Sequence, residues 1–126
     1  MITRVWIGAS IATLLCCGDI RAEDLTYEQH IRPIFRAHCF DCHGATDEIQ
    51  GGLDLRLVRF MIEGGDSGAA IFATNPKESY LVERLRSGEM PPGDTRVPET
   101  DIETIERWIA AGAKTARPEP DSIGPG

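Results

Sequence analysis

The sequence is short of the residues that build common metal sites and membrane spans. Its 126 residues include four cysteines and three histidines, and aromatic residues make up only 6% of them. No apolar run reaches the roughly 20 residues with which a helix crosses a bilayer. Basic side chains are also in the minority, with 13 against 20 acidic ones and a formal net charge of -7. This charge argues against nucleic acid as a partner.

The length predicts a single domain. A chain of 126 residues has room for one core, because single domains commonly contain about 100 to 150 residues. We expect a signal peptide at residues 1–22, the domain at residues 23–114 and a flexible tail at residues 115–126. The tail sequence "ARPEPDSIGPG" has the composition of a linker.

The first 22 residues have the pattern of a secretory signal peptide. Arg4 precedes the apolar run of residues 5–17, and Ala22 is a suitable last residue before cleavage. The run is too short for a membrane anchor. Lipidation is disfavoured because Leu15 stands where a small residue is expected before a lipidated cysteine. We therefore expect the protein to be periplasmic or otherwise exported. It would be attached to a membrane only if this segment is retained.

The stretch "AHCFDCHG" contains the two cysteines that remain after cleavage. Cys39 and Cys42 are three positions apart, and His43 follows directly. A redox dithiol needs no such histidine, and a zinc site needs further ligands from a second segment. The other histidines, His30 and His38, lie on this same stretch and are expected at the surface.

The C-x-x-C-H spacing predicts a covalently attached haem. Two thiols one helical turn apart can add to the two vinyl groups of a haem while the adjacent imidazole turns toward the iron. Neutral imidazole is a good iron ligand, and attachment outside the cytoplasm agrees with export. We expect one haem c per chain, with Cys39 and Cys42 as attachment sites and His43 as an iron ligand.

The sixth iron position decides the function of such a centre. Methionine, a second histidine, water or a substrate can fill it. Met61 recurs with apolar neighbours at helical spacing and is expected in the core. Met90 precedes Pro91, which favours an extended loop, and such a loop is able to direct a thioether at iron. An ordinary Pro-Gly turn is the alternative for Met90.

A first helix is expected within residues 25–39. Thr26 and Gln29 have the spacing of a capping box, and apolar residues that follow fall on one face. Pro33 either kinks this helix or marks its first turn.

Two further helices are expected on either side of the Met90 loop. Asn75 is the expected N-cap of the first, in which Tyr80, Leu81 and Leu85 point inward. In the second, Thr100 and Glu103 suggest a capping box, Ile102, Ile105 and Ile109 share a face, and Gly112 ends the helix. Trp108 is expected against the haem or the first helix. The predicted fold is an all-α module around a flat cofactor.

Several segments together resemble the cytochrome c modules of planctomycete-type secreted proteins. They are, in order, "IRPIFRAHCFDCHG", "GGLDLR", "EGGDSGAAI", "ESYLVERLR", "MPP" and "ETDIETIERWIAAGA". The resemblance implies a class I cytochrome c fold that encloses one haem. It also implies thioethers at Cys39 and Cys42, with His43 as the proximal ligand and Met90 as the distal ligand. Such modules usually precede larger domains, so a free-standing carrier and a module of a larger secreted redox protein both stay open.

Electron transfer to redox partner proteins is the expected function. A haem-based ligand-binding or sensing module is the first alternative, because a sixth ligand that detaches admits a gas. The "GDSGA" stretch, residues 65–69, is similar to a serine protease motif, but this chain is far too short for that fold and the stretch is expected to be a turn. We therefore expect no independent enzyme activity.

Overall fold

The structure is a computed structural model that describes residue 18 and residues 21–123. Most of the predicted signal peptide, residues 1–22, therefore lies outside the described residues. Within the described part, regular structure is helical, and the sole β feature is an isolated bridge between Gly65 and Gly68. The predicted all-α class is confirmed. The elements are η1 (Ala22–Asp24), η2 (Tyr27–Ile31), α1 (Arg32–His38), α2 (Phe40–His43), η3 (Gln50–Gly52), α3 (Val58–Glu63), η4 (Pro76–Glu78), α4 (Tyr80–Ser87) and α5 (Glu99–Ala110).

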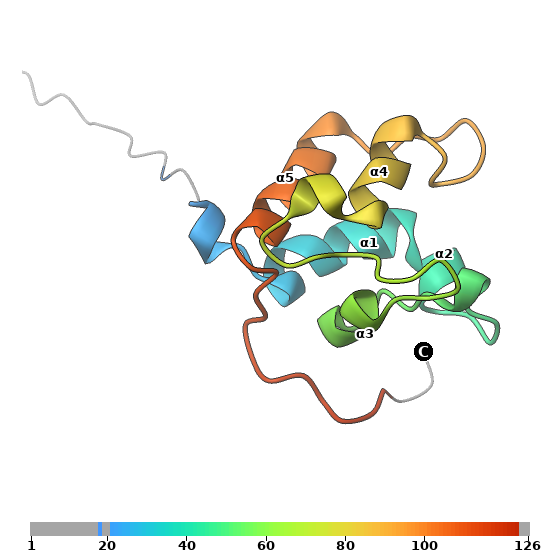
Figure 1. The fold of residues 1–126 in the computed structure, drawn as a ribbon, viewed down its shortest axis with the longest axis horizontal. Helices are drawn as coiled ribbons and strands as arrows, with labels where there is room; N and C mark the ends of the chain where they lie inside the picture. The colour runs from blue at the N-terminus through green and yellow to red at the C-terminus, as the bar shows by residue number, and fades with distance from the viewer. Residues whose placement is uncertain (1–17, 19–20, 124–126) are drawn as a thin grey trace, which may run out of the picture.

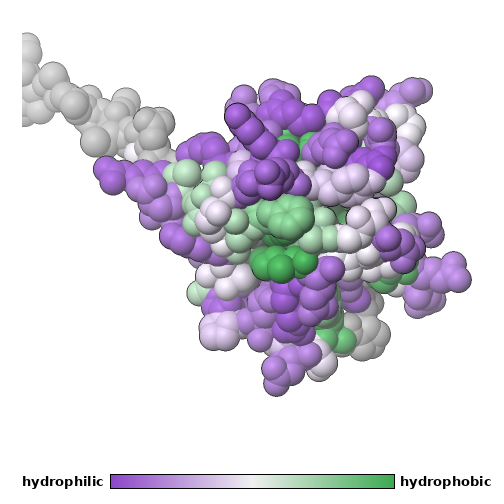
Figure 2. All heavy atoms as spheres, viewed as in Figure 1, coloured by the Kyte–Doolittle hydropathy of each residue, from purple (hydrophilic) through white to green (hydrophobic). Residues whose placement is uncertain are grey.

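The helices pack around a shared core. Helices α4 and α5 lie side by side in the upper part of Figure 1, the η2–α1 helix crosses the middle, and α3 lies below it. No helix in the described ranges has both the length and the apolar character needed to cross a membrane. The face drawn in Figure 2 is mostly hydrophilic, with a small hydrophobic area near its centre.

The first helix begins with a wide π turn, η2, that runs directly into α1. Pro33 is in the opening turn of α1, where its missing N–H costs least, so it marks the first turn. The predicted capping box is wrong. The backbone N–H of Thr26 donates to Nδ1 of His30 at 3.0 Å, while Gln29 is exposed. The His30 imidazole thus accepts the Thr26 N–H that the Gln29 side chain was expected to accept. Both His30 and His38, which were expected at the surface, are half-buried.

The helix expected after Asn75 is divided into η4 and α4. Asn75 precedes η4 but makes no side-chain capping bond, so its predicted N-cap role is wrong. Ser79 separates the two elements and is completely buried. Its Oγ donates to the Asn75 carbonyl at 2.9 Å and accepts from the Phe72 N–H at 2.9 Å. These bonds break the helix at Ser79 and tie α4 to the preceding loop.

Helix α5 begins one residue earlier than its predicted cap. Pro98 precedes the helix, and Thr100 lies inside it, where its carbonyl accepts a bond from Thr104 Oγ1 at 2.8 Å. The predicted box of Thr100 and Glu103 is therefore wrong. Gly112, with a φ of 104°, follows Ala111, the C-cap residue of the helix, and confirms the predicted stop.

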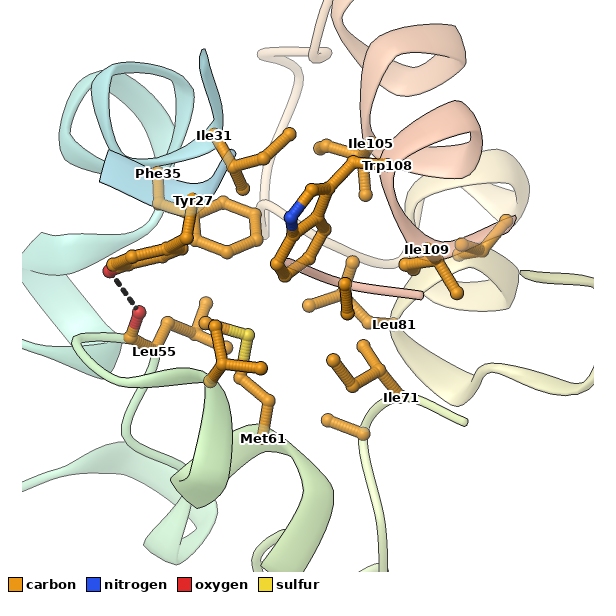
Figure 3. Close-up of a cluster of buried hydrophobic side chains, with 14 of the residues drawn as sticks. Tyr27, Ile31, Phe35, Leu55, Met61, Ile71, Leu81, Ile105, Trp108 and Ile109 are labelled. Carbon is orange, nitrogen blue, oxygen red and sulfur yellow. Dashed lines mark hydrogen bonds between the residues drawn. The ribbon is translucent and has the colours of Figure 1, made fainter. Parts of the chain in front are cut away.

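The core joins α5 to the first helix (Figure 3). Trp108 has an exposed fraction of 0%, and its ring centroid is 6.2 Å from that of Tyr27. Its Nε1–H donates to the Lys114 carbonyl at 2.9 Å, which satisfies the one polar group of the indole. Of the two predicted contacts for Trp108, the first helix is the one observed. Most of the largest fully buried side chains lie here as well: Ile31, Phe35, Met61, Ile71, Ile105 and Ile109.

The C-terminal segment folds back onto α3. It leaves α5 and runs below the body of the molecule in Figure 1. The carboxylate of Glu119 accepts bonds from the N–H groups of Val58 and Arg59, at 2.5 and 3.2 Å. The Arg59 guanidinium in turn donates to the carbonyls of Pro120 and Asp121. Despite its linker-like composition, this segment caps a helix.

Candidate functional site

A cavity of about 270 Å³ opens beside the C-x-x-C-H motif. Its walls come from α1, α2, the loops on either side of α3, helix α4 and the Met90 loop. Most of the wall is aliphatic, aromatic or glycine backbone, as expected for a site that holds a flat apolar ligand. The lining residues are Phe35, Cys39, His43, Gly51, Leu53, Leu55, Gly65, Ser67, Gly68, Ala70, Tyr80, Leu81, Arg84, Leu85 and Met90.

The motif forms a tight turn between α1 and α2. Cys39 joins the two helices, and its carbonyl accepts the N–H groups of both Cys42 and His43, at 3.2 and 2.9 Å. This turn places Cys39 and His43 on the cavity wall, while Cys42 is half-buried outside the lining. No disulfide joins Cys39 and Cys42. Burial, and then the neighbouring Cys42, raise the pKa of Cys39 to about 12, so this thiol stays neutral at ordinary pH.

The orientation of His43 is fixed by the segment that follows η3. Nδ1 of His43 lies 3.0 Å from the carbonyl oxygen of Leu53. The N–H of Leu55 donates to the His43 carbonyl at 2.8 Å, so ring and backbone are held by the same short segment. Because a carbonyl only accepts, Nδ1 carries the proton and Nε2 has a free lone pair. This is the arrangement that a metal-binding histidine needs.

The two candidate methionines lie in different environments. Met90 lines the cavity and is 40% exposed, and its N–H donates to the Arg84 carbonyl at 3.1 Å. Gly88, with a left-handed φ of 76°, ends α4 and lets the chain turn into this loop. Met61 is completely buried and is part of the core (Figure 3). Its predicted packing role is confirmed.

The "GDSGA" stretch is a turn at the rim of the cavity. The N–H groups of Gly65 and Gly68 each donate to the carbonyl of the other, at 3.1 and 3.0 Å, and Ser67 is exposed. A side chain at Gly65 would collide with the Gly51 carbonyl, so only glycine lets the turn lie against η3. The predicted turn is confirmed.

The sequence analysis expected Tyr80 to point inward but missed Arg84 at the cavity. Arg84 and Tyr80 both line it, one helical turn apart on α4. The Arg84 guanidinium lies 4.4 Å from the centroid of the Tyr80 ring and forms an ion pair with Glu89. The spacing of four residues between Tyr80 and Arg84 predicts that they lie on the same face of the helix, but it does not show whether that face meets the cavity.

The structure thus brings Cys39, His43 and Met90 to one cavity and leaves Cys42 beside it. Their bonds to a haem stay predictions. Over the described ranges, no group of three or more His, Cys, Asp or Glu side chains is arranged to hold a metal ion.

Part of the chain matches a known protein family. The family model described as Planctomycete cytochrome C matches residues 39–94. The matched stretch begins at the first cysteine of the motif and extends past Met90, so it includes every lining residue except Phe35. No curated protein and no solved structure gives a significant match.

Proposed function

We propose that this chain, a c-type cytochrome module of the planctomycete family over residues 39–94, is an exported one-electron carrier with a single haem c. One observation carries the proposal: an attachment cysteine, a histidine with a free Nε2 and a thioether all line one apolar cavity. Membership of a cytochrome c family implies covalent haem, and the residues present fit that group.

The chain's own residues divide the work of holding the cofactor. Cys39 and Cys42 supply the two thioethers, and His43 supplies the proximal ligand through Nε2. The Leu53 carbonyl holds the ring in position for that role. When bound, the haem would supply an iron that gains or loses one electron between its ferric and ferrous states.

Met90 is the proposed distal ligand. A soft thioether favours ferrous iron and raises the reduction potential. If His43 and Met90 both served as ligands, the centre would exchange electrons without binding a reactant. The aliphatic wall formed by Leu53, Leu55 and Leu85 should also raise the reduction potential, because a poorly solvated site disfavours the extra charge of ferric iron.

The first experiment is an absorption spectrum of the exported, purified protein. We expect a c-type spectrum and a haem that stays with the polypeptide in acidified organic solvent. A colourless polypeptide after extraction would refute covalent attachment. Replacing either Cys39 or Cys42 with alanine should leave one thioether at most and lower the yield of holoprotein.

The exposure of Met90 favours a second function, ligand binding at the iron. Met90 is 40% exposed and lies on a loop after the end of α4, so its side chain would leave the cavity more easily than a buried one. Carbon monoxide separates the two functions. An electron carrier keeps its reduced spectrum when the gas is added, whereas a sensor changes its spectrum.

A further inference from the structure

Arg84 has no role in the proposed attachment or ligation of the haem, yet it lines the cavity. Among the lining residues, all of which lie in the described part of the chain, it has the one side chain with a permanent charge. An arginine on a largely aliphatic wall needs an anionic partner, because an unpaired charge is costly to remove from water.

Glu89 meets that need only in part. Arg84 and Glu89 form an ion pair, but the Glu89 side chain is 54% exposed and the Arg84 side chain 35% exposed. Arginine has five N–H donors in a planar fork, more than one exposed carboxylate uses. The Tyr80 ring, 4.4 Å below the guanidinium, covers one face of that plane and limits how it can turn.

The expected cofactor carries two carboxylates, as propionate side chains, which require charge-assisted hydrogen bonds or water. We infer that Arg84 is a positioning residue that binds a haem propionate, with Tyr80 orienting its guanidinium and Glu89 sharing its donors. The inference rests on the proposed function. It adds a carboxylate subsite at the α4 side of the cavity, and arginine suits such a subsite because its fork can bind both carboxylate oxygens.

The test uses purified holoprotein with Arg84→Gln, Arg84→Lys and Arg86→Gln. Arg86 is the matched control, since it lies on the same helix but pairs with Glu99 and Glu106 outside the cavity lining. Two readouts are measured at fixed pH and salt: the propionate bending band in the resonance Raman spectrum and the reduction potential.

We expect Arg84→Gln to shift the propionate band and lower the potential, because removing a positive charge near the iron stabilises the ferric state. Arg84→Lys should keep the reduction potential close to the wild-type value, because the positive charge remains. It should still shift the propionate band, since an ammonium cannot bind both carboxylate oxygens as a guanidinium does. Arg86→Gln should leave the band unchanged and alter the potential less than Arg84→Gln does.

An unchanged band in Arg84→Gln holoprotein would overturn the inference while leaving the proposed function intact. If Arg84→Gln gives no holoprotein, Arg84→Lys decides, and a wild-type band in that variant overturns the inference. Loss of the covalent haem spectrum from the wild-type protein is a different result, and it would refute the proposed function itself.

Discussion

Nδ1 of His43 lies 3.0 Å from the carbonyl oxygen of Leu53, ten residues further along the chain. The same segment is anchored again two residues later, where the Leu55 carbonyl accepts the hydroxyl of Tyr27 at 2.7 Å (Figure 3). The first helix therefore supports the proposed iron ligand through a short piece of irregular backbone. Buried hydrogen bonds of this kind are costly to leave unmade.

Replacing Tyr27 with phenylalanine should destabilise the holoprotein. The change removes the hydroxyl but keeps the buried ring, and it leaves the Leu55 carbonyl without that partner. We expect a loss of about 1–3 kcal/mol in the free energy of unfolding, measured by denaturant titration. Thr104→Val is a control, because it removes a hydroxyl bond on the outer part of α5. Equal losses in the two variants would contradict a special role for Tyr27.

Tyr27 should also make stability depend on alkaline pH. Burial raises the pKa of its hydroxyl well above the value of 10.0 for an unfolded chain. Its contribution to stability is therefore complete below pH 10 and is lost as pH rises, because only the unfolded chain then releases the proton. Above pH 10 the loss should be about 1.4 kcal/mol per pH unit. The difference in the free energy of unfolding between wild type and Tyr27→Phe, measured across this pH range, isolates the contribution of Tyr27. If the free energies of the two proteins fall in parallel as pH rises, Tyr27 makes no such contribution.

Met90 and Met61 form a natural pair of variants. Met90→Ala should abolish any sulfur-to-iron absorption band, admit exogenous ligands and lower the reduction potential. Met61→Ala should keep the spectrum but cost about 2–5 kcal/mol, because it creates a cavity in the core. Spectra and denaturant titrations of both proteins check this. A native low-spin spectrum in Met90→Ala would show that the ligand is assigned wrongly.

Glu119 should contribute to stability although it lies in the C-terminal tail. Its carboxylate accepts the first N–H groups of α3, which otherwise have no partner within the helix. We expect Glu119→Ala to reduce the free energy of unfolding by about 0.5–2 kcal/mol, the usual cost of losing an N-cap. Glu103→Ala, at an exposed site on α5, serves as the comparison. If the two variants unfold alike, the tail is not a functional cap.

The haem-free chain should be poorly folded. Leu53, Leu55 and Leu85 line the cavity and have fewer partners without a cofactor, and a group bound only by the native state adds to its stability. Calorimetry of the Cys39→Ala/Cys42→Ala variant should show no cooperative transition near that of the holoprotein. A similar transition temperature in both proteins would contradict this.

The sequence predicted local features better than long-range partners. The C-x-x-C-H turn and the burial of Met61 depend on spacing along one short segment, and both were recognisable. The caps predicted at Thr26, Asn75 and Thr100 were wrong for separate reasons, and Thr100 fails because α5 already begins at Glu99. His30 replaces the expected glutamine, and a break at Ser79 shortens the next helix.

Other features of the site and of the fold had no sequence signal. The partner of His43 is a backbone carbonyl, which every residue has, so the identity of Leu53 says nothing about that role. The bonds between Glu119 and α3 join residues about 60 positions apart, and the tail's composition suggested a linker. Contacts of this kind depend on how the chain returns on itself rather than on local spacing.

The anchoring of residues 53–55 has a consequence for the speed of electron exchange. The His43 ring, the His43 carbonyl and the Tyr27 hydroxyl each bond to this short segment, so the imidazole has little freedom to shift or rotate. An electron moves slowly when the bonds around the iron must rearrange with each change of charge. If His43 is the proximal ligand, as proposed, we expect this anchoring to keep that reorganisation energy small and the rate of self-exchange between oxidised and reduced molecules high.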